Sequence, residues 1–154
     1  MNIGRNEKIN IIKDELVKIR RDLINIKLWE KEIKLIDEKI NSYGDINYNE
    51  IGFKSKNTFT LEDILRKDEN RKEILESKIF YAKYKSKLKD YEMYINLLEE
   101  DKQKVIKEIY IKNLEKKKVS FRIVAQITKF SKSQVERFHK EALEDIYNKK
   151  FGNS

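Results

Sequence analysis

Isoleucines recur at intervals of seven residues along the N-terminal part of the chain, and this spacing is the strongest constraint on its fold. They are Ile12, Ile19, Ile26, Ile33 and Ile40. Ile9, Leu16 and Leu23 complete a stripe with alternating four- and three-residue steps, before Glu30 and Asp37 interrupt it. Such a stripe follows one face of an α-helix and packs against another helix. We therefore predict one long helix over Glu7–Asn41 that needs a partner.

The near absence of helix breakers extends this prediction to the whole chain. The 154 residues include no proline and only four glycines, while 40% of the residues are charged and 39% are hydrophobic. Proline breaks a helix interior and glycine weakens it. We therefore predict an all-α fold, with the apolar residues spread along helix seams.

Between the first and second predicted helices lies the stretch "NSYGDINYNEIGFKSKNTFT". Gly44 and Gly52 fall here among asparagines and serines, a composition that predicts a linker near 42–58. A second helix is expected to start near Thr60, because Thr-Leu-Glu-Asp offers a capping hydroxyl followed by first-turn acids.

The second helix is expected to carry its own heptad stripe and to continue to Leu98. The stripe comprises Ile74, Ser77, Tyr81, Tyr84, Leu88, Tyr91, Ile95 and Leu98. Tyrosines at this spacing favour a buried helix seam over a platform for stacking nucleic-acid bases. The simplest arrangement is an antiparallel hairpin with the first helix. Either stripe could instead pair with its copy in a second subunit.

Three shorter helices are predicted after the second one. Glu99–Ile111 is amphipathic, and "KNLEKKKVS" after it reads as a basic loop. Ser120 is expected to cap a helix over "FRIVAQIT", and Ser131 a final helix over about 132–149.

The last two predicted helices have the features of a helix–turn–helix, a short helix and a tight turn followed by a helix that enters the major groove. Ala125 and Val135 are expected to face each other where the helices cross. Ile123 or Val124, Ile127 and Phe130 are expected to fill the space between them. The turn often needs a positive φ and commonly has glycine, yet here Lys129 occupies that place, with Thr128 where leucine is common.

Polar and basic side chains around this motif suit DNA. The expected base-reading residues are Lys132, Ser133, Gln134, Glu136, Arg137 and Lys140. The expected phosphate-binding residues are Lys116, Lys117, Lys118, Ser120, Arg122, Lys129 and Ser131. From Asp101 onward, fourteen Lys and Arg face seven Asp and Glu, which gives +7 of the chain's net +8. The positive charge is therefore concentrated where a polyanion is expected.

The segment "LLEEDKQKVIKEIYIKNLEKKKVSFRIVAQITKFSKSQVERFHKEALEDI" resembles region 4 of sigma factors, including the pair Ala142-Leu143 near its end. With a long helical N-terminal half, the whole chain resembles the phage-encoded transcriptional regulators of the RinA and ArpU type. This resemblance implies an activator of phage late or packaging genes that binds double-stranded DNA, with RNA polymerase as a further partner. We expect a long helical region over 1–98 and a DNA-binding domain over 99–154.

Other classes of function fit the sequence less well. His139 is the only histidine and there is no cysteine, so histidine-pair catalysis, thiol chemistry and cysteine-bound metals are excluded. His139 is expected to contact phosphate or to pack. No phosphate-binding glycine loop is present. We expect a non-enzyme without cofactor or metal. The lack of a signal peptide or a membrane span of about 20 apolar residues favours the cytoplasm, and the resemblance implies that of a bacterial host.

Two alternatives remain open at this point. A small terminase subunit also joins a helix–turn–helix to oligomerising helices, but typically places the DNA-binding part first and forms rings. A helical scaffold or adaptor would bind no nucleic acid. The sequence also allows a homodimer formed through the N-terminal helices.

Overall fold

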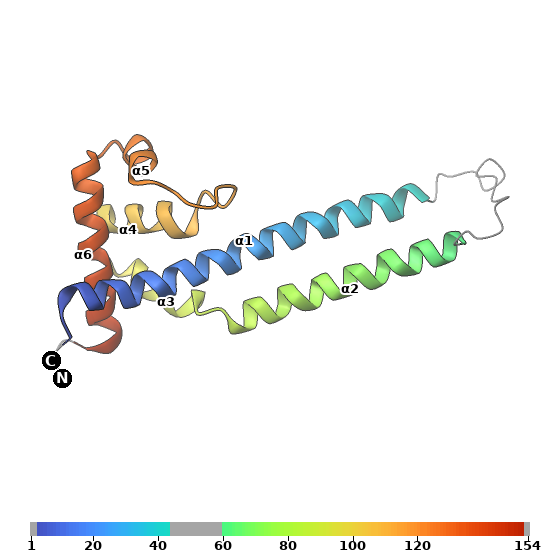
Figure 1. Ribbon diagram of the computed structural model, residues 1–154, viewed down its shortest axis with the longest axis horizontal. Coiled ribbons are helices and arrows are strands. Elements are labelled where there is room, and N and C mark those ends of the chain that lie inside the picture. Colours follow the sequence, from blue (N-terminus) through green and yellow to red (C-terminus); the bar gives the residue numbers. More distant parts are fainter. Residues whose placement is uncertain (1–2, 44–59, 153–154) are drawn as a thin grey trace. The chain divides into compact units, whose positions relative to one another are not determined.

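The computed structural model describes residues 3–43 and 60–152, which are helical apart from short connections and contain no strand. The prediction of an all-α fold is confirmed. The elements are α1 (Arg5–Tyr43), α2 (Leu61–Lys85), α3 (Leu88–Asn96), α4 (Glu100–Ile106), the π-helical turn η1 (Lys107–Ile111), α5 (Phe121–Thr128) and α6 (Lys132–Phe151) (Figure 1). Beyond Tyr43, the predicted linker near 42–58 lies outside the described residues.

The start of α2 agrees with the predicted capping signal, but its end does not. The Thr60 hydroxyl accepts a hydrogen bond from the Asp63 amide, and the Asp63 carboxylate accepts one from the Thr60 amide, each at 3.2 Å. The prediction of a continuous helix to Leu98 is wrong. The Ser86 hydroxyl accepts the Leu88 amide at 3.1 Å, and such local side-chain bonds compete with a helix interior. A separate helix, α3, therefore begins at Leu88.

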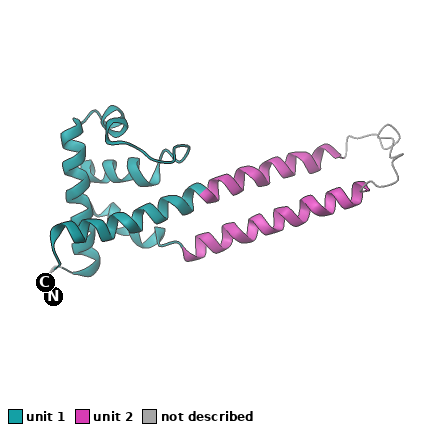
Figure 2. Cartoon of the chain, in the orientation of Figure 1, with its two compact units in different colours: residues 1–24, 86–154 teal, residues 25–85 magenta. Residues whose placement is uncertain are grey.

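The chain divides into two compact units (Figure 2). Unit 1 comprises residues 1–24 and 86–154, and unit 2 comprises Asn25–Lys85. This division differs from the expected boundary between residues 98 and 99. The reason is that Leu16 of α1 and Tyr91 of α3 belong to the same core as the C-terminal helices, so both ends of the predicted N-terminal region join unit 1.

Unit 1 is organised around α6, which packs against α3, α4 and α5. Fully buried side chains from five helices meet in its core: Ile12, Leu16, Tyr91, Ile95, Val105, Ile106, Val124, Val135, Leu143 and Ile146. The first half of the α1 stripe is therefore covered by several elements of unit 1, and the positions of α5 and α6 are fixed by a shared core.

Unit 2 is an antiparallel pair formed by α2 and the second half of α1 (Figure 1). Cross-helix ion pairs define the direction, because Glu30 meets Lys83 at one end and Lys39 meets Asp68 at the other. These ion pairs join α1 and α2 of the same chain, which agrees with the predicted antiparallel hairpin.

The side of α2 that faces α1 differs from the predicted stripe. Asp68 and Lys72 form ion pairs with α1, and Leu75 on the same side is fully buried. In contrast, Ile74 and Tyr84 are 50% and 80% exposed. The predicted seam is therefore wrong for this part of α2, whereas its later members Tyr91, Ile95 and Leu98 are buried in unit 1.

Candidate nucleic-acid interface

The three residues between α5 and α6 form a tight turn with the predicted left-handed residue. Lys129 has φ 68° and ψ 11°, and its amide donates to the Ala125 carbonyl at 2.9 Å. A lysine in this conformation costs roughly 1–2 kcal/mol compared with the right-handed region. The chain therefore places a cation where glycine would relieve backbone strain.

Both helices of the motif begin with the predicted serine caps. The Ser120 hydroxyl accepts the Ile123 amide at 3.3 Å, and the Ser131 hydroxyl accepts the Gln134 amide at 3.1 Å. In return, the Gln134 side-chain oxygen accepts the Ser131 amide at 2.9 Å, which completes a capping box. Replacing such a cap typically costs 0.5–2 kcal/mol, so the start of α6 is defined by its own sequence.

The packing between α5 and α6 confirms part of the predicted interior. Val124 and Val135 are fully buried, and the Phe130 and Phe138 rings meet edge to face at 5.3 Å between centroids. The expectation that Ile127 fills this space is wrong, because its side chain is 47% exposed. Ala125 and Ile123 are partly buried against the same core.

The face of α5 that points inward explains this difference. Val124 is fully buried and marks the inner side of α5. One turn later, the Thr128 hydroxyl donates to the Val124 carbonyl at 2.7 Å. Ile127 follows Val124 by three residues, so its side chain is rotated by about 60° from that of Val124 and lies at the edge of the inner side.

His139 is a packing residue of α6 rather than a phosphate contact. Its ring is buried, and Nε2 forms a 2.7 Å hydrogen bond with the Tyr110 hydroxyl. The centroids of the His139 and Phe121 rings lie 5.1 Å apart. Burial, with smaller effects from the charges of Lys13 and Lys140, lowers the pKa of His139 to about 4. The imidazole is therefore neutral at pH 7.

The predicted base-reading residues all lie in the first half of α6. Glu136 is half-buried. The other five are exposed: Lys132, Ser133, Gln134, Arg137 and Lys140. Ser133, Arg137 and Lys140 follow one another at helical spacings of four and three residues, so they share one face. The prediction for Gln134 needs a restriction, because its side-chain oxygen already serves the capping box. In bidentate reading of adenine, the same oxygen would accept a second hydrogen bond from the orientation that the capping box gives it.

The predicted phosphate-binding residues are exposed as well. They are Lys116, Lys117, Lys118, Ser120, Arg122, Lys129 and Ser131. These residues occupy the basic loop 112–119, the start of α5 and the turn before α6, and they belong to unit 1 together with the outer residues of α6. Residues 112–140 contain nine Lys and Arg against two Glu, a net charge of +7.

Arg20 anchors the basic loop, and sequence reasoning did not identify it. Its guanidinium is buried and donates to the carbonyl oxygens of Lys112, Asn113 and Lys116 at 2.8, 2.7 and 2.6 Å. Burial lowers the pKa of Arg20. A charged residue beside Ile19 of the apolar stripe is the only signal the sequence offers for this contact.

Asn113 adds a second constraint on the same loop. Its φ of 57° lies in the left-handed region, and its side-chain amide donates to the Glu108 carbonyl at 3.0 Å and the Glu108 carboxylate at 2.9 Å. Asparagine tolerates this conformation better than most residues. The loop therefore leaves η1 along a defined path before it reaches Lys116.

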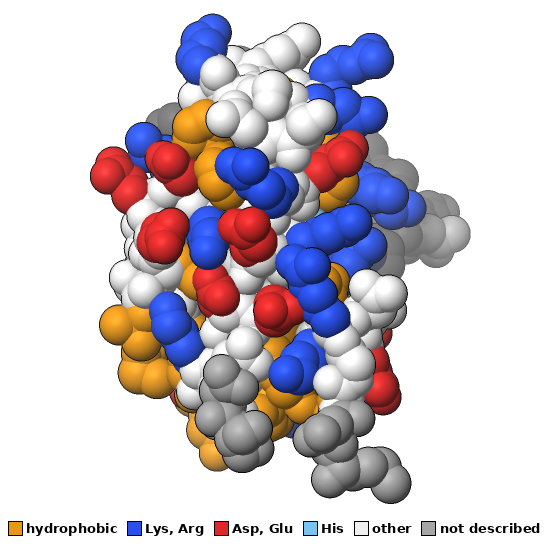
Figure 3. Space-filling view, turned by 90° about the vertical axis from the view of Figure 1, so that its left-hand side faces the viewer, with side chains coloured by type: hydrophobic (Ala, Val, Ile, Leu, Met, Phe, Trp, Pro, Cys, Tyr) orange, Lys and Arg blue, Asp and Glu red, His pale blue; other side chains and the backbone are white. Residues whose placement is uncertain are grey.

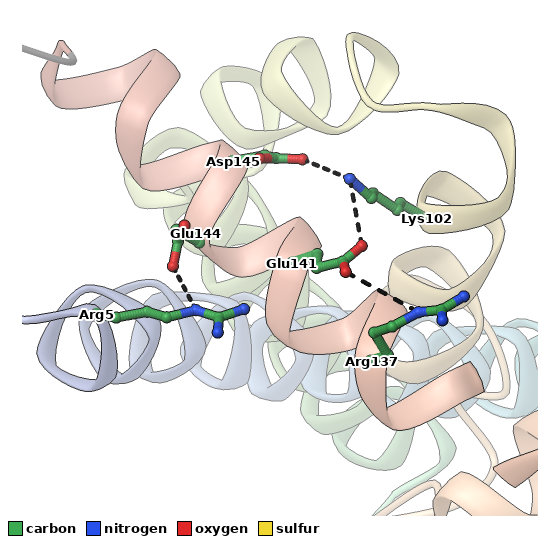
Figure 4. Close-up of polar contacts among 6 residues, drawn as sticks. All are labelled: Arg5, Lys102, Arg137, Glu141, Glu144 and Asp145. Atoms are coloured by element: carbon green, nitrogen blue, oxygen red, sulfur yellow. Dashed lines mark hydrogen bonds and ion pairs between the residues drawn. The ribbon is translucent and has the colours of Figure 1, made fainter. Parts of the chain in front are cut away.

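Three of the four acidic residues of α6 form ion pairs with other helices of unit 1 (Figure 4). Lys102 of α4 lies 3.6 Å from Glu141 and 3.0 Å from Asp145, while Arg5 of α1 contacts Glu144 at 2.6 Å. Acidic and basic side chains are accordingly interspersed over the face shown in Figure 3. These three carboxylates thus form ion pairs within unit 1, whereas the side chains of Lys132, Arg137 and Lys140 are exposed.

Glu141 also links this network to the first half of α6. The Arg137 guanidinium lies 3.9 Å from the Glu141 carboxylate and 5.1 Å from the Phe138 ring centroid. The arginine side chain is nevertheless 61% exposed. Arg137 is therefore partly oriented by neighbours on its own helix and remains accessible to a ligand.

Comparisons with protein-family models, curated proteins and solved structures found no match to this chain. Within residues 3–43 and 60–152, no helix combines the length and apolar character needed to cross a membrane. The same part of the chain has no group of three or more acidic or histidine side chains able to hold a metal ion.

Proposed function

We propose that this protein is a sequence-specific DNA-binding transcriptional regulator without enzymatic activity. In this proposal, the first half of α6 enters the major groove, and the basic loop and the interhelical turn contact phosphates. The supporting observation is a pair of capped helices joined by a tight turn, whose exposed outer residues belong to a segment with net charge +7. A helix–turn–helix needs this combination.

The regulatory part of the proposal draws on the resemblance of residues 97–146 to sigma factor region 4. We propose that the protein activates late genes of a phage or prophage in the cytoplasm of the bacterial host. RNA polymerase is the proposed protein partner, and a homodimer is the proposed active form. A site recovered from a random duplex library separates these arrangements, because a palindrome requires a dimer and a single asymmetric site favours a monomer acting with polymerase.

The decisive test of base reading is the Arg137→Ala variant. Arginine recognises guanine through two acceptors, and one such contact contributes about 1–3 kcal/mol of discrimination. We expect affinity for the selected site to fall about tenfold or more, and affinity for random DNA to fall much less. The matched control is Lys34→Ala, which removes an exposed cation of α1 in unit 2. Equal losses on both DNAs would eliminate the base-reading role of Arg137.

Salt dependence tests the role of the basic loop separately. A protein that neutralises six phosphates loses roughly a thousandfold in affinity between 50 and 200 mM salt. Replacing Lys116, Lys117 and Lys118 with alanine should weaken binding to all duplexes. The slope of the logarithm of the binding constant against the logarithm of the salt concentration should fall by the amount expected for about three phosphate contacts. Absence of salt-sensitive binding in the unaltered chain would support a scaffold or adaptor instead. A ring of eight or more subunits would support a small terminase subunit.

A further inference from the structure

The outer face of α2 carries an apolar stripe that none of the described residues of unit 2 covers. Ile74, Ser77, Tyr81 and Tyr84 follow one another at spacings of three, four and three residues, and all four are exposed. Phe80 beside them is 74% exposed. Soluble proteins rarely leave contiguous apolar surface of this kind without a binding partner.

This stripe lies opposite the side of α2 that contacts α1. Leu75, which is fully buried, and Lys72, which pairs with Asp37 of α1, mark the covered side. Ser77 is two residues beyond Leu75 and five beyond Lys72, so its side chain is rotated by about 200° and 140° from theirs. A helix packed on the outer stripe would therefore meet α2 on its free side.

Charges on the two edges of the stripe favour a second copy as the partner. One edge carries Glu69, Glu73 and Glu76, and the other carries Lys78 and Lys85, all exposed. The Lys78 ammonium lies 5.9 Å from the centroid of the Trp29 ring of α1, a weak cation–π contact that an ion pair across the dimer would replace. In a parallel pair of identical helices, opposite edges meet, and a residue contacts the partner residue five positions later. Glu73 of each copy then faces Lys78 of the other. In an antiparallel pair, like edges meet, so lysine would face lysine and glutamate would face glutamate.

We propose that a second copy of this chain covers the outer face of α2, with the two α2 helices parallel and in register. Ile74, Ser77, Tyr81 and Tyr84 form the apolar seam of this dimer, and Glu73 pairs with Lys78 across it twice. The inference depends on unit 2 alone and holds whether or not the chain binds DNA. A dimer of this kind carries two DNA-binding units and would favour a palindromic site.

Disulfide trapping of the full chain tests this arrangement, because the protein has no cysteine of its own. Equivalent seam positions of a parallel pair face each other all along the helix. Ser77→Cys and Tyr84→Cys should therefore both form disulfide-linked dimers under mild oxidation. Glu76→Cys, an exposed control adjacent to Ser77, should not. Cross-linking at only one of the two seam positions, or equally at the control, would overturn the parallel register.

Charge exchange provides a second, independent measurement by sedimentation equilibrium. Glu73→Lys alone and Lys78→Glu alone should each raise the dimer dissociation constant several-fold, because like charges then face each other. A mixture of the two single variants should form heterodimers preferentially, since both pairs become attractive again. A monomeric mass for the unaltered chain at micromolar concentration would contradict the proposal. So would single variants that each form homodimers as tightly as they form heterodimers in the mixture.

Discussion

Units 1 and 2 are both built from amphipathic helices, yet they bury their apolar side chains to different degrees. In unit 1, five helices surround one core, and residues such as Leu143 and Ile106 have no exposed surface. In unit 2, the buried apolar residues among those described are Ile26, Leu61 and Leu75. Cross-helix ion pairs accompany this thin core.

The difference shows that a heptad stripe predicts a contact but not its partner. Two helices can bury only one stripe each, whereas a bundle of several helices can bury more than one. The predicted stripe beginning at Ile74 illustrates both outcomes, because Tyr81 is exposed in unit 2 and Tyr91 is buried in unit 1. Stability should accordingly depend on core packing in unit 1 and on weaker surface contacts in unit 2.

The largest effect should come from truncating a core leucine of unit 1. Leu143→Ala removes a fully buried side chain and should lower the free energy of unfolding by about 2–5 kcal/mol, because it leaves a cavity. Leu35→Ala in unit 2 is the matched control, since Leu35 is 60% exposed, and should change it by about 0.5 kcal/mol or less. Urea denaturation followed by circular dichroism measures both, and similar losses would contradict the contrast in burial.

Acidification should weaken unit 1 through its single histidine. The folded pKa of His139 is about 4 compared with 6.5 for the ordinary group, so between these values the unfolded chain binds a proton that the folded chain does not. Stability should be fully present above about pH 6.5 and fall by on the order of 3 kcal/mol as the pH approaches 4. Urea denaturation at several pH values measures this slope.

The His139→Phe variant separates this contribution from that of the carboxylates. It should lack the pH dependence between about pH 6.5 and 5 and show a smaller slope between about pH 5 and 4, where the carboxylates continue to titrate. If both proteins show the same slope above pH 5, the buried imidazole does not contribute to the acid sensitivity of the fold.

The smallest effects concern the two arginines that tie helices to other segments. Arg20→Met removes three part-buried hydrogen bonds to carbonyl oxygens and should lower the free energy of unfolding by about 1–3 kcal/mol. Arg71→Met removes an exposed ion pair with Glu32 and should cost about 1 kcal/mol or less. Amide hydrogen exchange should increase over 112–118 only in the Arg20 variant. Equal exchange in both variants would show that Arg20 does not anchor the loop.

Local features of the fold were the most predictable from sequence. The serine caps, the turn at Lys129 and the bounds of α5 and α6 depend on residues within four positions of one another. Capping and turn preferences act over this range. The all-α class followed similarly from the absence of proline and from the seven-residue periodicity of α1.

Features that depend on contacts distant in sequence were less predictable. The break after Lys85 separated a stripe that looked continuous, and the side of α2 that faces α1 carries Asp68, Lys72 and Leu75 in place of the predicted stripe residues. Arg20 contacts residues more than ninety positions away. No local propensity encodes which carbonyl groups will lie beside it, so its role becomes visible only when unit 1 is assembled.

The way in which Arg20 holds the basic loop has a consequence for the evolution of this protein. Its three hydrogen bonds go to main-chain oxygens, which every amino acid possesses, and to no side chain of the loop. Mutations that add, remove or exchange the lysines at 116–118 therefore leave the anchor intact. Selection can adjust the charge of this loop step by step, and so tune attraction to a polyanion, without a compensating change in the scaffold.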